Sequence, residues 1–144
     1  MSTVLVAGAT QGTGRALAAE YARRGADVLI TGRSQERATT AAEELAQETG
    51  GTVTGLALDL SRPADIEAAL ASVRHVDRVA LVGMVRDMNT ARAYDVATAA
   101  TLATTKIVGY TAVVTTLFPG CPRTPRCCCS AAWRRTSRIR ARRR

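Results

Sequence analysis

The sequence has 144 residues, of which 47% are hydrophobic and 22% charged, and this length suits one globular domain. It contains neither an apolar run long enough to span a membrane nor a signal-peptide pattern, so we expect no membrane segment. The formal net charge is +8, but residues 1–117 hold all twelve acidic residues and only eleven basic ones. The excess positive charge belongs to residues 118–144, which hold nine arginines and no acidic residue.

A glycine-rich segment near the start of the chain carries the clearest functional signal. Residues 4–7 predict a buried strand, and residues 15–22 predict a helix that ends at a glycine. Gly8, Gly12 and Gly14 lie between the two elements. Glycine permits a tight turn and a close approach of the backbone, and the free N–H groups of a first helical turn bind anions. The pattern therefore predicts a loop that holds a pyrophosphate.

The spacing G-x-x-x-G-x-G resembles the cofactor loop of the short-chain dehydrogenase/reductase family, and the resemblance continues to about residue 117. It implies a dinucleotide bound at the carboxyl ends of parallel strands. The cofactor-binding positions that it implies are Gly8, Thr10, Gln11, Gly12, Thr13, Gly14, Arg33, Asp59, Leu60 and Gly83.

The end of the second predicted strand, residues 26–31, bears on the choice of cofactor. In the family, an acidic residue at this point binds the ribose 2′-hydroxyl of NAD. No acidic residue stands at positions 31–33, and Arg33 is placed to bind a 2′-phosphate through its charge and its forked donors. The sequence therefore predicts NADP as the cofactor, with NAD as the second choice, unless Arg33 is an ordinary solvated loop residue.

The remaining elements alternate between helix and strand, which predicts an α/β, Rossmann-like, doubly wound parallel sheet. Asp59 ends one of the strands and matches the acidic residue that contacts the adenine in the family. The resemblance implies a longer sheet, so we expect residues 1–117 to be an incomplete Rossmann domain, truncated after about four strands. The expected elements are a helix at 34–48 capped by Ser34, a strand at 52–58, a helix from Ser61 to about 73, a strand at 76–83 and a helical stretch at 89–117.

The catalytic motif of the family is missing. Members carry a tyrosine four residues before a lysine, but none of Tyr21, Tyr94 and Tyr110 is followed by lysine at that spacing. The only lysine, Lys106, precedes Tyr110 by four residues, so the two could touch on a helix, although we favour an exposed charge on the helix surface. Lys106 aligns with a helix asparagine of the family. The Asn-Asn-Ala-Gly motif is likewise replaced, by Leu-Val-Gly-Met at 81–84. We therefore assign no catalytic residue.

The composition changes at Phe118, and residues 118–144 contain all four cysteines and nine of the nineteen arginines. An arginine-rich arm for nucleic acid is one interpretation. Three adjacent cysteines do not have the spacing of a zinc site, so no metal is expected, and a disulfide framework is not expected in a reducing compartment. We favour a frame-shifted or disordered segment. In the neighbouring reading frame every Cys-Cys junction must encode leucine, and the stretch can then be read as the end of a family helix followed by a fifth strand.

The sequence thus predicts an NADP-dependent oxidoreductase of this family, which transfers hydride to or from a carbonyl or an alcohol, in a truncated and inactive form. A dinucleotide-binding fragment without catalysis is the alternative, and nucleic-acid binding through the basic tail is a weaker one. The expected partners are the dinucleotide, a small substrate and a second copy docked through residues 90–117. The expected location is the cytoplasm.

Overall fold

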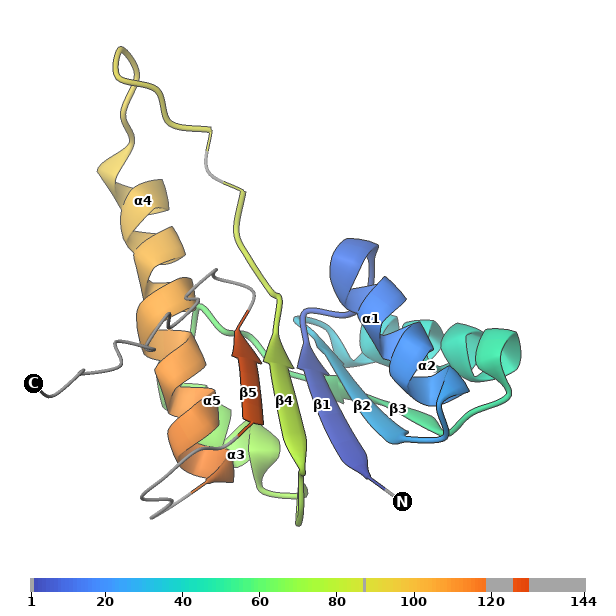
Figure 1. Cartoon of the computed structure of the whole chain (residues 1–144). Helices are drawn as coiled ribbons and strands as arrows, with labels where there is room; N and C mark the ends of the chain where they lie inside the picture. Colours follow the sequence, from blue (N-terminus) through green and yellow to red (C-terminus); the bar gives the residue numbers. More distant parts are fainter. Residues whose placement is uncertain (1, 87, 119–125, 130–144) are drawn as a thin grey trace, which may run out of the picture.

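The computed structural model describes residues 2–86, 88–118 and 126–129, the last four through their backbone alone (Figure 1). One parallel sheet lies between two helical layers. The elements are β1 (Thr3–Ala7), α1 (Gly12–Arg23), β2 (Asp27–Gly32), α2 (Gln35–Thr49), β3 (Val53–Ala57), the short 3-10 helix η1 (Pro63–Asp65), α3 (Ile66–Leu70), β4 (Arg78–Leu81), α4 (Val96–Ala103), the π-helical segment η2 (Thr104–Gly109), α5 (Tyr110–Leu117) and β5 (Arg126–Cys129).

The sheet has the strand order β3-β2-β1-β4-β5, and every pair of neighbours is parallel. The chain runs outward from β1 to β3 and then crosses back to place β4 on the other side of β1. This confirms the predicted Rossmann-like, doubly wound α/β sheet. Ligands of such sheets bind beyond the carboxyl ends of the strands where the strand order reverses, which is here between β1 and β4.

Each face of the sheet packs against its own set of helices (Figure 1). Helices α1 and α2 cover one face through small side chains such as Ala18, Ala22 and Ala41, which let the helices lie close to the strands. Helices α3 and α5 cover the other face through larger residues such as Ile66 and Val113. The central strand β1 is buried from Val4 to Ala7, as expected for a strand of a parallel sheet that is covered on both sides.

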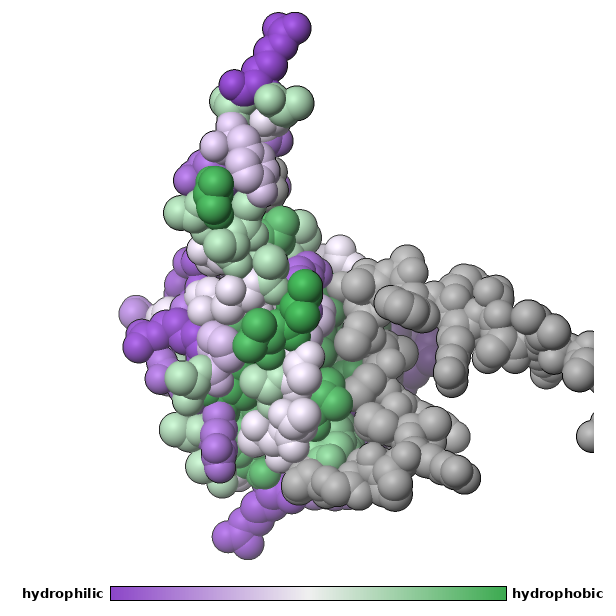
Figure 2. All heavy atoms as spheres, turned by 90° about the vertical axis from the view of Figure 1, so that its left-hand side faces the viewer, coloured by the Kyte–Doolittle hydropathy of each residue, from purple (hydrophilic) through white to green (hydrophobic). Residues whose placement is uncertain are grey.

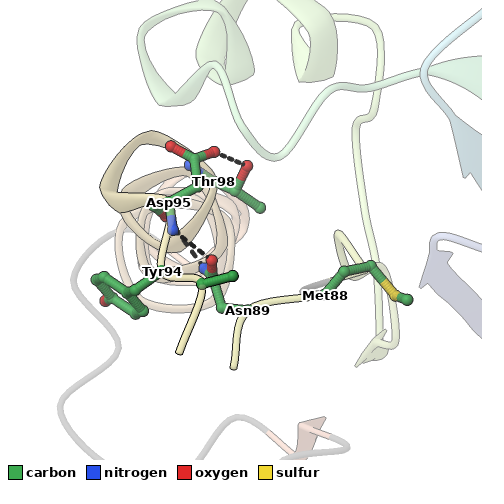
Figure 3. Close-up of a pocket in the computed structure, with 6 residues that line it drawn as sticks. Met88, Asn89, Tyr94, Asp95 and Thr98 are labelled. Atoms are coloured by element: carbon green, nitrogen blue, oxygen red, sulfur yellow. Dashed lines mark hydrogen bonds between the residues drawn. The ribbon is translucent and has the colours of Figure 1, made fainter. Parts of the chain in front are cut away.

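The helix predicted to begin at residue 89 begins instead at Val96, so the prediction is wrong for residues 89–95. The carboxylate of Asp95 caps α4 by accepting hydrogen bonds from the backbone N–H groups of Ala97 and Thr98, both at 3.1 Å. The side chain of Asn89 bonds the backbone of Asp95 in both directions and fixes the preceding loop (Figure 3). Asparagine and aspartate bond the backbone in loops and caps, and this local preference outweighs the helical composition.

Beside the four expected strands, Arg126–Cys129 forms a fifth strand that pairs with β4 in parallel. An open edge of β4 would leave a row of backbone donors and acceptors without partners, and β5 satisfies them. Arginine and cysteine gave no strand signal in the sequence. The rest of the predicted arginine- and cysteine-rich tail lies outside the described residues.

The helices α4, η2 and α5 form one continuous rod at the outer side of the molecule (Figure 1). Apolar side chains gather on the exposed face of this rod (Figure 2). Val96 and Ile107, on α4 and η2, are 69% and 67% exposed. Within the described segments, we find no helix with the length and apolar character needed to cross a membrane.

Candidate functional site

The glycine loop between β1 and α1 is shaped by close backbone contacts. Gly8 has φ of +83°, and a Cβ atom at this position would overlap the Cα atom of Gly83 at the end of β4. A Cβ atom at Gly14 would overlap the carbonyl oxygen of Gly8. Glycine is therefore required at both positions, at the first by the left-handed backbone and at both by the lack of space.

Thr31, at the end of β2, holds the start of this loop. Its carbonyl oxygen accepts hydrogen bonds from the N–H groups of Gly8 and Ala9, at 3.2 and 3.0 Å. The Thr31 side chain is 1% exposed, and its hydroxyl lies 3.3 Å from the same Gly8 nitrogen. Sequence reasoning missed Thr31 as a site residue, although a polar residue closing a buried apolar strand was a usable signal.

The N-terminus of α1 suits an anion. The Gln11 side chain does not cap the helix, and no acidic residue lies in the first turn. Gln11, Gly12 and Thr13 are exposed, so the N–H groups of the first turn face an open surface. Thr10 lies beside them with its methyl group against Gly32, where a Cβ atom would come within 2.5 Å of it. These features fit the pyrophosphate of a dinucleotide.

Arg33 lies directly after β2, close in sequence to Thr31 and beside the glycine loop. Its side chain is exposed and makes no ion pair or hydrogen bond with any residue that the structure describes. The same holds for the side chain of Arg37, one turn into α2. A guanidinium without a carboxylate partner is available to an added phosphate.

The structure brings three of the other predicted residues to the same edge of the sheet. Asp59 follows β3, and its carboxylate accepts hydrogen bonds from the N–H and the hydroxyl of Ser61, at 2.9 and 2.7 Å. Leu60 is 6% exposed and packs in the core, with its Cδ1 atom 2.7 Å from the position of a Cβ atom on Gly83. A Cβ atom at Gly109 would overlap the carbonyl oxygen of Leu60. Leu60 and Gly83 therefore shape the edge through packing, and Gly109, not singled out from the sequence, joins them.

Lys106 and Tyr110 meet above the end of β4. The Nζ atom of Lys106 lies 2.9 Å from the hydroxyl oxygen of Tyr110 and 4.9 Å from the centre of its ring. The Tyr110 hydroxyl donates to the carbonyl oxygen of Gly83 at 2.7 Å. The structure forms the contact that helical spacing allows, whereas we favoured an exposed surface charge and Lys106 is partly buried.

The loop before α4 forms a shallow hollow of about 440 Å³ on the surface (Figure 3). Met88, Asn89, Tyr94, Asp95 and Thr98 line it, and the polar groups among them mostly bond one another. The hydrogen bonds from the Thr98 hydroxyl and from the N–H groups of Thr98 and Ala97 hold the pKa of Asp95 below its usual value. The hollow is lined by none of the predicted cofactor residues, and the hydrogen bonds of Asn89 and Asp95 fix the start of α4 beside it.

Comparison with known proteins identifies similar chains. A family model described as short chain dehydrogenase matches residues 2–121. The human dehydrogenase/reductase SDR family member 13 is 49% identical over 73 residues, which cover 50% of this chain and 18% of that protein. The 3-oxoacyl-[acyl-carrier-protein] reductase FabG of Aquifex aeolicus is 41% identical over 69 residues, which cover 48% of this chain and 28% of that protein. The matched segment thus spans less than a third of either relative.

Solved structures share the fold. A short-chain dehydrogenase from Sphingobium yanoikuyae in complex with NADPH is 28% identical, with a TM-score of 0.69, and the match covers 83% of this chain and 48% of that one. L-Sorbose reductase from Gluconobacter frateurii, complexed with NADPH and L-sorbose, gives a TM-score of 0.73 at 20% identity, over 83% of this chain and 47% of that one. The chain spans about half the length of these structures.

Proposed function

The chain belongs to the short-chain dehydrogenase family of oxidoreductases, and on this premise we propose that it binds NADP(H) in preference to NAD(H). The dinucleotide lies across the carboxyl ends of β1, β2 and β4. Its pyrophosphate accepts hydrogen bonds from the first turn of α1, and its 2′-phosphate pairs with Arg33. The observation that carries this proposal is the unpaired guanidinium of Arg33 beside an uncapped helix N-terminus.

Two further observations support the preference for NADP(H). The segment 31–33 offers no carboxylate to a ribose 2′-hydroxyl and none to repel a 2′-phosphate. The similar dehydrogenase from Sphingobium yanoikuyae was solved with NADPH. Asp59 keeps one carboxylate oxygen bonded to Ser61, so it contributes to the adenine side as a fixed acceptor.

A bound nicotinamide would donate a hydride to a carbonyl compound or accept one from an alcohol, as in the reactions of this family. In this chain, Gly8 and Gly14 allow the backbone to approach the cofactor, and Thr31 holds the loop through its carbonyl oxygen. Leu60 and Gly83 pack together at the same edge of the sheet. The 144 residues contain no Tyr-x-x-x-Lys to protonate a carbonyl. We therefore propose that this chain binds the dinucleotide without turning it over.

A direct titration tests the proposal. NADPH fluorescence, followed as the protein is added, gives the affinity, and NADH titrated in the same way gives the preference. The expected result is tighter binding of NADPH by about tenfold or more, as one charge-assisted contact provides. Equal affinities would remove the assigned role of Arg33. Steady oxidation of NADPH in the presence of simple ketones, aldehydes or quinones would contradict the absence of turnover.

For residues 118–144, we propose a shifted reading frame as the source of the arginines and cysteines. The family match ends at residue 121, close to the change in composition at Phe118. Resequencing of the gene across the codons for residues 117–121 tests this directly. An insertion or deletion there supports the proposal, and an unchanged sequence makes the basic segment a genuine part of the protein.

We also propose that the chain acts in the cytoplasm and that two copies pair through residues 90–117. The support for pairing is the row of exposed apolar side chains along α4 and η2, which includes Val96, Ile107 and Val108 (Figure 2). Sedimentation equilibrium tests it. A monomer at micromolar concentration would contradict the pairing.

A further inference from the structure

Lys106 is the only lysine in the sequence, and it lies in the π-helical segment η2. Its side chain is partly buried rather than extended into solvent, because its Nζ atom is held 2.9 Å from the Tyr110 hydroxyl oxygen. A π-helical insertion shifts the side chains that follow it out of α-helical register, and such segments are frequent at functional sites. The placement of this ammonium group therefore needs an explanation.

The hydrogen bonds of Tyr110 place the ammonium at the edge of the sheet where the strand order reverses. The Tyr110 hydroxyl donates to the Gly83 carbonyl oxygen at 2.7 Å, so Lys106 is two hydrogen bonds from the end of β4. Gly83 in turn lies against Gly8, the first residue of the glycine loop. The ammonium thus lies on the β4 side of the proposed cofactor crevice, opposite the side on which Arg33 follows β2.

The charge of Lys106 has no counter-ion within the described chain. No carboxylate forms an ion pair with it, and the Tyr110 hydroxyl is neutral. An ammonium has three N–H donors, and only one of them is used by Tyr110. A partly buried charge without a partner is costly, and a bound anion offsets that cost.

We infer that Lys106 binds an anionic oxygen of the ligand in the crevice between β1 and β4, with Tyr110 fixing the ammonium in place. This rests on the proposed dinucleotide binding. The anionic oxygen is supplied either by the pyrophosphate of the dinucleotide or by a carboxylate of the substrate. Lys106 is then a second cationic contact, on the side of the crevice opposite Arg33.

The single lysine allows a direct test on the intact chain. Protein labelled with [6-13C]lysine gives one side-chain carbon resonance, which reports on Lys106 alone. NADPH is titrated first, then pyruvate in the presence of saturating NADPH. The control is 2′-AMP, which carries the 2′-phosphate but lacks both the pyrophosphate and the nicotinamide half. We expect NADPH or pyruvate to move the resonance and 2′-AMP to leave it in place.

The titrations separate the two sources of the anion. A shift with NADPH alone assigns the contact to the dinucleotide, and a further shift only on adding pyruvate assigns it to a carboxylate. Lys106→Met is expected to lower the affinity for the ligand that moves the resonance by about tenfold, and Lys106→Arg is expected to keep most of that affinity. If NADPH binds but neither NADPH nor pyruvate moves the resonance, or if 2′-AMP moves it equally, the inference is overturned.

Failure of the proposed function is distinguishable from failure of the inference. If NADPH does not bind the unmodified chain at all, dinucleotide binding is wrong, and inorganic pyrophosphate is titrated in its place. A shift of the Lys106 resonance with pyrophosphate, together with weaker pyrophosphate binding by Lys106→Met, still supports an anion site. An unmoved resonance overturns the inference as well.

Discussion

The part of the molecule from β1 to β3 and the part from the end of β4 to α5 contribute to the same edge of the sheet in different ways. In the first part, a contiguous loop supplies the contacts, and the helices lie on the sheet through buried alanines. In the second part, a loop of exposed residues precedes a helical rod with apolar side chains facing outward. The first part therefore presents a helix N-terminus built mostly from neighbouring residues, whereas the second part depends on residues brought together from distant elements.

Among the substitutions that test this difference, replacing a loop glycine is expected to have the largest effect on dinucleotide binding. In Gly14→Val, the new side chain overlaps the Gly8 carbonyl oxygen, so dinucleotide binding should fall below detection. Overpacking at this point also costs about 1–3 kcal/mol of stability. The matched control is Gly25→Asn, because Gly25 has positive φ but open space around it. Binding that survives Gly14→Val, measured by NADPH fluorescence, would reduce the loop to an ordinary turn.

Arg33→Ala should have the next largest effect. Loss of a guanidinium–phosphate contact is expected to cost about 1.5–3 kcal/mol, which is roughly a tenfold or larger loss of NADPH affinity. NADH affinity should change little, because NADH lacks the 2′-phosphate. Arg37→Ala is the control for a general loss of positive charge at the start of α2. A similar loss in both variants would show that the effect is not specific to Arg33.

Tyr110→Phe tests the link between the helical rod and the glycine loop. The variant loses the hydrogen bond to the Gly83 carbonyl, so we expect about 1 kcal/mol less stability in urea unfolding and a smaller loss of NADPH affinity. The control is Tyr94→Phe, since Tyr94 is 66% exposed. Equal stabilities of the two variants would mean that the Tyr110 hydroxyl does not hold the two parts together.

Protonation of Asp95 is expected to have the smallest effect, because it changes the stability of the start of α4 alone. Because its pKa is lowered in the folded chain, the cap stabilises α4 above the unfolded-state pKa, and this contribution is lost as the pH falls through the folded-state pKa. Circular dichroism in an acid titration should show a loss of helix at low pH. Asp95→Asn keeps a capping oxygen but does not titrate, so an unchanged acid transition in that variant would contradict this role.

The sequence predicted the first part of the molecule better than the second, for physical reasons. Strand, glycine loop and helix are encoded by neighbouring residues, and the Ser34 cap was found where it was expected, with its hydroxyl 3.5 Å from the Arg37 nitrogen. The loop at 89–95 depends on side-chain bonds to the backbone that composition does not reveal. The contact of Tyr110 with Gly83 joins residues 27 positions apart, and no local pattern encodes it. The pairing of β5 with β4 is likewise set by the open strand edge rather than by β-propensity.

Hydrogen–deuterium exchange with and without NADPH decides whether the glycine loop binds a dinucleotide, since it reports on both parts of the molecule in one experiment. We predict slower exchange at residues 8–14 and 33–35 when NADPH is bound, a weaker effect with NADH, and no change within α4. Unchanged exchange at residues 8–14, or protection confined to residues 118–144, would contradict the claim that the glycine loop is a dinucleotide-binding site.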